Sequence, residues 1–216
     1  DISTHYECDW KIPYLHVDPA TLGRKFEKFI RINSQSGKGG TRYVMEVEYG
    51  IKMPPELLKN FQAEVQALAD SKEAELVSEE LWDLFRQNYI DCPGPIVLKK
   101  YLPRPDEKNP ESIHGEVHLL YDGKSEVLSA TGNGPISAFT EALRPRVPFV
   151  FHLQDFKEIS LNKGADAEAL AYVAITGPGD KVTCGVGLGT NIDQAAVKAI
   201  VSAVNKQCTR QEKTGN

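Results

Sequence analysis

The chain has 216 residues, of which 41% are hydrophobic and 25% are charged, a composition that is ordinary for a globular protein. Its formal net charge of −5, together with lysines and arginines scattered along the sequence, argues against a nucleic-acid-binding protein. No run approaches the roughly 18 apolar residues of a membrane-spanning helix, and the polar start at Asp1 does not resemble a signal peptide. We therefore expect one large domain, or a small domain plus a substantial linker region, with neither a nucleic-acid nor a membrane partner.

The cysteines and histidines do not form a recognisable metal site. The four cysteines are Cys8, Cys92, Cys184 and Cys208. Their spacings are too wide for a zinc knuckle or a redox pair, so we expect buried or incidental thiols in a reducing compartment. His114 and His118 are four residues apart in an alternating, strand-like segment, which places them two pleats apart and predicts packing or solvated roles.

The first forty residues give few structural signals. Residues 1–23 are irregular and show little periodicity, so we expect them to pack against another part of the protein. The run Asn33–Gly40 is typical of a polar, glycine-rich turn. It superficially resembles a phosphate-binding loop, but Ile32 stands where that motif needs glycine, and Gly39 stands where it needs serine or threonine. A structural turn is the better interpretation.

Two helices are predicted next. Pro55 is well placed at the start of the first. Its buried face is expected to comprise Leu57, Leu58, Phe61, Val65 and Leu68. Ser78 is the expected N-cap of the second helix. The buried stripe of that helix is expected to comprise Leu81, Trp82, Phe85 and Tyr89. The run Asp91–Pro95 is rich in proline and glycine and indicates a domain boundary.

After Pro95 the pattern changes to strands. The expected strands are Ile96–Leu102, Val117–Tyr121 and Lys124–Ala130. Asp122-Gly123 between the last two is typical of a hairpin turn. The run Gly132–Pro135 then leads into a helix with Pro135 at its first position. Ile136, Phe139 and Leu143 share one face of that helix.

The same order of elements then repeats. The expected strands are Phe149–Ile159, Ala171–Thr176 and Val182–Leu188. Thr190 is the expected N-cap of a helix whose apolar stripe runs from Ile192 to Val204. The sequence thus predicts two βββα units in tandem, related by a pseudo-twofold axis. Each unit is too small to enclose a core alone, so the two units should pack together.

The run Gly132–Pro135 is the candidate binding motif of the chain. The first turn of a helix offers unpaired N–H groups, and glycines allow a carboxylate to approach the backbone. Ile136 and the facing residues Leu153 and Phe156 could add an apolar wall, which would suit a small aliphatic amino acid. The residues alone favour a tight turn that binds nothing, because glycines at helix starts are common. No nucleophile elbow, catalytic triad or metal site is evident.

Several segments resemble 2-isopropylmalate synthases of the long, fungal and actinobacterial type. The matching segments are Trp10–Pro19, Gly23-Arg24, Ile30–Gly40, Gly132–Pro135 and Val201–Asn205. The string Asn33–Gly40 is highly specific for that family. The resemblance implies that residues 1–29 end a first linker subdomain, 30–92 form a second and largely helical one, 93–211 form an α+β regulatory domain of two βββα units, and 212–216 are a tail.

The resemblance also implies what this chain lacks. The family's enzyme condenses acetyl-CoA with 2-oxoisovalerate at a divalent-metal site in a TIM barrel, and that barrel is absent here. We therefore expect the chain alone to be non-catalytic and to carry no cofactor. Tyr14 matches a linker tyrosine that reaches towards the active site in the family and takes part in regulation. The expected location is the cytoplasm, or the mitochondrion if the source is a fungus.

In the family, leucine binds between the two βββα units at a dimer interface and inhibits the enzyme. The matching positions are Gly132, Asn133, Gly134, Ile136, Ala138, Leu153, Phe156, Ser160 and Ala167. The sequence departs from the family pattern at three single positions and at one pair of residues. Phe156 replaces a tyrosine, Ser160 an alanine and His16 a proline, and Ala165-Asp166 replaces an acidic pair.

We expect a homodimer, because the stripe from Ile192 to Val204 is rich in alanine and two small sheets leave apolar faces uncovered. Three alternatives remain open. The first is the regulatory region of a citramalate or homocitrate synthase that senses another amino acid. The second is a structural dimer module without an effector. The third is a catalytically competent acyltransferase fragment.

Overall fold

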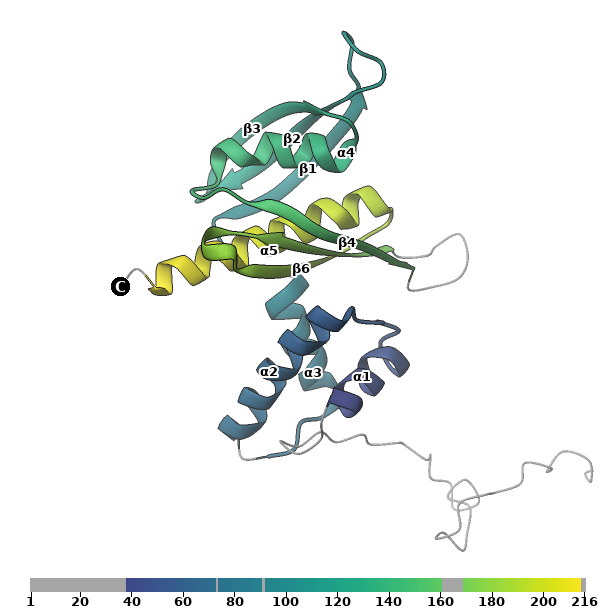
Figure 1. Cartoon of the computed structure of the whole chain (residues 1–216), viewed down its shortest axis with the longest axis vertical. Helices are drawn as coiled ribbons and strands as arrows, with labels where there is room; N and C mark the ends of the chain where they lie inside the picture. Colours follow the sequence, from purple (N-terminus) through teal and green to yellow (C-terminus); the bar gives the residue numbers. More distant parts are fainter. Residues whose placement is uncertain (1–37, 73, 91, 161–168, 215–216) are drawn as a thin grey trace, which may run out of the picture. The chain divides into compact units, whose positions relative to one another are not determined.

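The computed structural model describes residues 38–72, 74–90, 92–160 and 169–214. The amino-terminal elements are α1 (Lys38–Val47), α2 (Pro55–Lys72), α3 (Ser78–Phe85) and the π-helical turn η2 (Arg86–Ile90). The first βββα unit comprises β1 (Ile96–Pro105), β2 (Ile113–Tyr121), β3 (Lys124–Gly132) and α4 (Pro135–Leu143). The second comprises β4 (His152–Ser160), β5 (Ala169–Thr176), β6 (Val182–Gly189) and α5 (Ile192–Thr214). This order confirms the predicted α+β class and the two tandem units (Figure 1). No helix in the described ranges is long and apolar enough to span a membrane.

The sequence predicted a turn up to Gly40, and this prediction is wrong for Lys38 to Gly40. The structure describes Lys38 to Gly40 as the first turn of α1, whereas residues 33–37 lie outside the described part. Two glycines cost a helix about 1 kcal/mol each relative to alanine. The fully buried side chains of Val44 and Met45 offset that cost, because each contributes roughly 1.5–3 kcal/mol. Tertiary packing outweighs local propensity here.

Helices α2 and α3 are held together by an aromatic cluster. The ring of Phe61 meets those of Phe85 and Tyr89 edge-on, with centroids 5.3 and 6.0 Å apart, and Phe85 stacks on Tyr89 at 5.3 Å. All three rings are fully buried, as predicted, whereas Trp82 of the predicted α3 stripe is only partly buried. One position of the α2 stripe is wrong. Ala69 is buried and Leu68 is only partly so, because Ala69 follows Val65 by one turn.

The N-caps of α3 and α5 each lie one residue away from the predicted position. Helix α3 is capped at Val77, whose N–H donates to the Glu80 carboxylate at 3.1 Å, so Ser78 is already helical. Helix α5 begins at Ile192, and Asn191 precedes it. The Asn191 side chain accepts the N–H of Gln194 at 2.9 Å, so Asn191 and not Thr190 acts as the cap.

The two sheets have the same topology. Each is antiparallel, with strand order β1-β2-β3 and β4-β5-β6. Asp122 and Gly123 join β2 to β3 with φ of 48° and 78°, which confirms the predicted hairpin turn. Helix α4 contacts β2 and β3, and α5 contacts β5 and β6 (Figure 1). The repeat seen in the sequence is therefore a repeat in structure.

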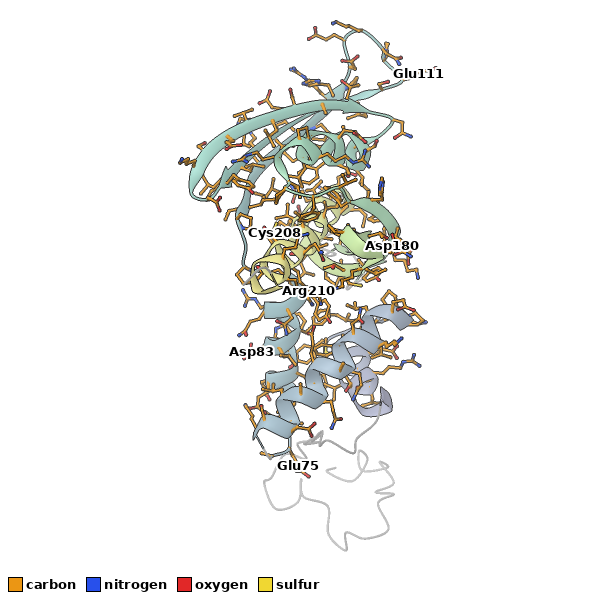
Figure 2. All side chains as sticks on the ribbon, turned by 60° about the vertical axis from the view of Figure 1, so that its left-hand side comes forward. Glu75, Asp83, Glu111, Asp180, Cys208 and Arg210 are labelled. Atoms are coloured by element: carbon orange, nitrogen blue, oxygen red, sulfur yellow. The ribbon has the colours of Figure 1, made fainter. Side chains whose placement is uncertain are left out.

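The two units share one hydrophobic core, as their size predicts. The core includes buried side chains of both sheets and both helices, among them Val117, Phe139, Val173 and Ile200. Cys208 of α5 also belongs to it (Figure 2). Cys92 and Cys184 are buried as well, which confirms the expectation for the described cysteines, whereas Cys8 lies outside the described residues.

Helix α5 packs so closely against β6 that the backbones of the two elements are in contact. Three alternate residues of β6 that face α5 are Gly185, Gly187 and Gly189. The α5 residues opposite them include Ala195, Ala199 and Ala203, all fully buried. An added Cβ at Gly187 would stand 2.0 Å from the carbonyl oxygen of Ala195, so only glycine fits. The alanine stripe that the sequence suggested for a dimer contact is thus buried inside the chain.

Asn205 of α5 fastens the start of β1. Its Oδ1 accepts the N–H of Ile96 at 3.0 Å, and its Nδ2 donates to the carbonyls of Ile96 at 2.8 Å and Cys92 at 3.2 Å. The side chain is 3% exposed, so these three bonds replace water that cannot reach the site. Nearby, Ser202 donates to the carbonyl of Ile90. The connection between η2 and β1 is therefore bound to α5 by side chains.

Lys206, the next residue of α5, reaches the helical segment. Its Nζ lies 3.1 Å from the Glu64 carboxylate of α2 and 3.6 Å from the centroid of the Tyr89 ring. Glu64 also accepts a hydrogen bond from Asn88 at 3.0 Å. Burial lowers the pKa of the Lys206 ammonium, and the charge of Glu64 opposes that shift. This partly buried ion pair joins α5 to α2 and η2.

Gly187→Ala is expected to lower the free energy of unfolding by about 1–3 kcal/mol, because the added methyl group must push α5 away from β6. Urea unfolding followed by circular dichroism measures the loss. Gly39→Ala is the matched control: a Cβ there meets nothing within 4 Å, and alanine favours a helix, so this variant should be at least as stable as the parent. An unchanged midpoint for Gly187→Ala would contradict the packing described.

Asn205→Ala is expected to destabilise the protein by about 1–3 kcal/mol, because it leaves buried backbone groups of Ile96 and Cys92 without partners. Asn205→Asp should cost more, since a carboxylate oxygen would then face two carbonyl oxygens. Urea unfolding tests this: the midpoint should be highest for the parent, lower for Asn205→Ala and lowest for Asn205→Asp. An aspartate variant as stable as the parent would show that the amide donor is unimportant.

Candidate functional site

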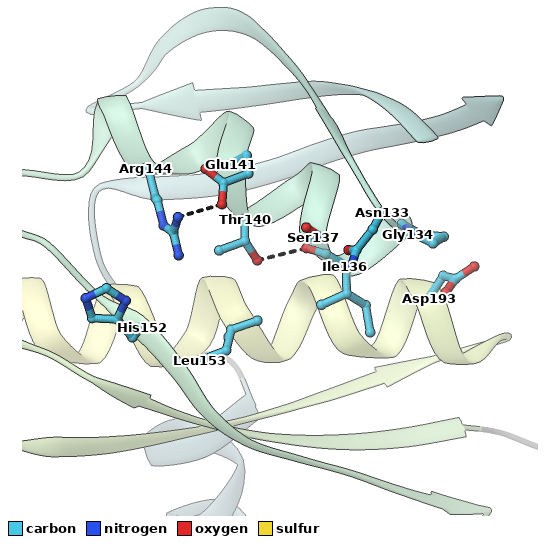
Figure 3. A pocket seen from close by; sticks show the side chains of 11 residues that line it. Asn133, Gly134, Ile136, Ser137, Thr140, Glu141, Arg144, His152, Leu153 and Asp193 are labelled. Carbon is cyan, nitrogen blue, oxygen red and sulfur yellow. Dashed lines mark hydrogen bonds and ion pairs between the residues drawn. The ribbon is translucent and has the colours of Figure 1, made fainter. Parts of the chain in front are cut away.

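An open groove of about 470 Å³ lies between the two βββα units (Figure 3). Helix α4 and the turn before it form one side, the start of β4 forms the other, and Asp193 of α5 lies at one end. Four predicted site residues line it, namely Asn133, Gly134, Ile136 and Leu153. The structure thus brings together residues from both units, as a site between them requires.

The end of the groove at Gly134 exposes an uncapped helix start. Gly134 is the N-cap of α4, with extended backbone, and no side chain caps the helix. Pro135 occupies the first helical position, as predicted, and has no N–H. The next two N–H groups belong to Ile136 and Ser137. These N–H groups point out of the helix start, which also carries the partial positive charge of the helix dipole. Both features favour a bound anion.

The two glycines of the motif have different roles. A Cβ at Gly132 would stand 2.5 Å from the N atom of Ala138, so Gly132 allows the end of β3 to pass under α4. A Cβ at Gly134 would meet nothing within 4 Å. Ala138 is fully buried and, like Gly132, does not line the groove. These two predicted site residues therefore support the turn, and Gly134 faces open space.

A β-bulge arranges the apolar side of the groove. The register of β4 against β5 shifts between Leu153 and Asp155, so Leu153 pairs with Ile175 and Phe156 with Val173. The two β5 partners are alternate residues, which puts Leu153 and Phe156 on the same sheet face. Leu153 lines the groove, whereas Phe156 packs on the core beside it.

Three predicted site residues cannot be placed. Ser160 ends β4, but its side chain lies outside the described part, as do Ala167 and Tyr14 entirely. The departures noted at Ser160 and Ala165-Asp166 therefore stay without a structural account.

The sequence missed the polar lining of the groove. The missed residues are Ser137, Thr140, Glu141, Arg144, His152 and Asp193. Thr140 and Arg144 follow Ile136 by one and two helical turns, so the helical period could have indicated them. Thr140 is buried and donates to the carbonyl of Ile136 at 2.8 Å. Asp193 could not be found in this way, because it lies in the other unit.

The charged side chains are distributed unevenly along the groove. Arg144 is ion-paired with Glu141 at 2.5 Å, and both lie near His152, away from Gly134 (Figure 3). The Arg144 Nε is buried without a hydrogen-bond partner in the described residues. Asp193 lies at the opposite end, close to the start of α4. A ligand in the groove would therefore meet different charges at its two ends.

Tyr101 of β1 supports the first turn of α4 from behind. Its hydroxyl donates to the carbonyl of Pro135 at 2.5 Å, and its ring meets Phe139 edge-on at 5.2 Å. Burial raises the pKa of Tyr101 to about 12, and the negative charge of Asp193 adds to the shift. The carboxylate of Asp193 thus acts electrostatically at the start of α4.

A larger hollow of about 640 Å³ lies between η2, β1 and α5. Its lining includes Trp82, Ile96 and Val201, and none of the predicted site residues. Asn205 and Ser202 on its wall already have backbone partners. In the described part of the chain, no group of three or more metal-ligating side chains comes together either there or in the groove.

The matches to known proteins agree with this architecture. Residues 2–46 match the family described as alpha-isopropylmalate synthase, post-catalytic domain-like, and residues 75–208 match the LeuA allosteric (dimerisation) domain. Over 200 residues the chain is 37% identical to the 2-isopropylmalate synthase of Corynebacterium efficiens, covering 92% of this chain and 34% of that protein. The corresponding enzyme of Thermobifida fusca is 40% identical over 200 residues, with 93% and 34% covered.

The relative from Mesorhizobium japonicum, also a 2-isopropylmalate synthase, is 38% identical over 200 residues, with 91% of this chain and 35% of that protein covered. The chain thus spans about a third of the length of these relatives. Both family matches agree with the resemblance found in the sequence, and the second covers both βββα units. The chain therefore belongs to the LeuA allosteric (dimerisation) domain family.

Proposed function

We propose that this chain is the allosteric regulatory and dimerisation region of a 2-isopropylmalate synthase, and that its groove binds leucine for feedback inhibition. The observation that carries the proposal is the groove between the two βββα units, which combines an uncapped helix start with an apolar side. The parent enzyme would be a 2-isopropylmalate synthase, as its relatives are named, and would act in leucine biosynthesis, as the family resemblance implies.

The proposed binding mode follows from the chemistry of the groove. The leucine carboxylate would accept the N–H groups of Ile136 and Ser137, where the helix dipole contributes roughly 0.3–1 kcal/mol. The aliphatic side chain would lie against Ile136 and Leu153, with Phe156 beside them. Its burial would contribute roughly 1.5–3 kcal/mol. The apolar contacts, more than the dipole, would then set the affinity.

The effector proposal is tested by calorimetry with leucine, isoleucine and valine on the parent chain and on Gly134→Val. We expect the parent to bind leucine and the variant to lose that binding, because the new side chain fills the open space above the helix start. The fold should tolerate it, since a Cβ at Gly134 has room. Ile136→Ala should weaken binding roughly tenfold, by removing part of the apolar wall.

Gly39→Val, at an equally open position in α1, is the matched control and should bind like the parent. Leucine binding that is unchanged in Gly134→Val would place the site elsewhere. A parent that binds none of the three amino acids would favour the structural dimer module. A parent that prefers another amino acid would favour a related synthase.

The dimerisation part of the proposal requires an uncovered surface. The α5 stripe is internal, so it cannot supply that surface. The face of the first sheet that points away from α4 carries Val97, Leu102 and Val127, all exposed. These side chains share the face with Glu116 and His118, so the surface is partly apolar, and exposed apolar side chains on one sheet face can serve as an interaction surface.

We expect the parent chain to sediment as a homodimer at micromolar concentration, and Val127→Asp to shift it towards the monomer by placing a charge in the contact. Val127 is 58% exposed, and Val47 of α1, at 60%, provides the control Val47→Asp. A parent that is monomeric throughout would contradict dimerisation. A Val127→Asp variant that stays dimeric would place the contact on another surface.

A further inference from the structure

Two carboxylates line the groove, and they differ in their partners. Glu141 is held by Arg144 in an ion pair at 2.5 Å. Asp193 makes no hydrogen bond or ion pair with the part of the chain that the structure describes. It is half-buried in the first turn of α5 and lies close to Gly134 (Figure 3). Asp193 belongs to the first turn of α5, where the helix dipole favours a negative charge, so its carboxylate is stable there and its oxygens remain available to a ligand.

The position of Asp193 brings opposite charges together at one end of the groove. The negative charge of Asp193 acts on Tyr101, whose hydroxyl is bonded to the carbonyl of Pro135 in the first turn of α4. The N–H groups of Ile136 and Ser137 leave the same turn. This end of the groove therefore offers hydrogen-bond donors with partial positive charge and, close by, a full negative charge.

An α-amino acid matches this pairing. Its carboxylate and its ammonium group are bonded to one carbon atom, so both must find partners of opposite charge within a few ångströms. The corresponding 2-oxo acid has the same side chain and the same carboxylate, but a neutral carbonyl oxygen replaces the ammonium group. Apolar contacts with Ile136 and Leu153 cannot distinguish the two molecules. A carboxylate facing the α-substituent can, because it attracts the ammonium group and repels a carbonyl oxygen.

We propose that Asp193 binds the ammonium group of the effector and makes the groove select an α-amino acid over the 2-oxo acid with the same side chain. The inference rests on the proposed effector function and adds its specificity-determining residue. Asp193 stands at the second helical position of α5, and Ile136 stands at the second position of α4. Equivalent positions of the two repeats thus have different roles: Asp193 would bind the ammonium group, and Ile136 would contact the aliphatic side chain.

The experiment is calorimetry of leucine and 4-methyl-2-oxopentanoate against the parent, Asp193→Asn and the control Glu56→Gln, which changes an acidic residue in the first turn of α2 outside the groove. We expect the parent to bind leucine at least about tenfold more tightly than the 2-oxo acid, as lost recognition of a charged group implies. In Asp193→Asn, leucine should bind roughly tenfold or more weakly and the 2-oxo acid should bind more tightly, so that the preference nearly disappears. Glu56→Gln should keep the preference, because it removes a charge from a first helical turn that does not line the groove.

Asp193→Glu keeps the negative charge and should retain most of the preference, which separates the loss of charge from any disturbance of the helix start. Circular dichroism checks that each variant is folded. A parent that binds the 2-oxo acid as tightly as leucine, or an Asp193→Asn variant that keeps the parent's preference, overturns the role of Asp193 and leaves the effector site standing. A parent that binds neither compound overturns both proposals.

Discussion

The contact of α5 with β6 is the constraint on which the rest of the regulatory domain depends. Glycine at Gly185, Gly187 and Gly189 removes the side chains that would separate the helix from the sheet. The helix can therefore bury its alanine face against backbone and direct its larger residues, such as Ile200 and Val204, into the core shared with the first unit. A larger residue in β6 would displace α5 from both sheets.

Because α5 is placed so firmly, it connects regions that are far apart in the sequence. Its first turn carries Asp193 at the groove, and its later turns carry Asn205 and Lys206. Asn205 holds the start of β1, and Lys206 pairs with Glu64 of α2. The helix thus joins the proposed effector site to the helical segment that precedes the regulatory domain.

Sequence patterns predicted the repeat well, since strand alternation and turn residues are local signals. The Asp122-Gly123 turn and Pro135 at a helix start are determined by backbone preferences, and both were found where the sequence placed them. Helix α1 was missed because its glycines predict a turn and only tertiary burial of Val44 and Met45 makes it helical.

The site was predicted only in part, because local signals reveal only those of its residues that are close together in the sequence. Asn133, Gly134 and Ile136 belong to one continuous motif, which a sequence reveals directly. Asp193 meets them only after the chain has folded, so no local pattern connects it to the motif. The alanine stripe shows the converse error, because small residues predict close approach without indicating whether the neighbour is a second chain or a strand of the same chain.

The glycine–alanine contact also has a mechanical consequence. Alternate residues of a strand are about 6.6 Å apart, and residues four apart in a helix are about 6 Å apart. The glycines of β6 and the alanines of α5 therefore stay in register over several turns. Because the two backbones pack this closely along several turns, we expect the helix and its sheet to move together as one body. A force applied at Asp193 would reach Lys206, about 20 Å along the helix axis, with little loss to bending.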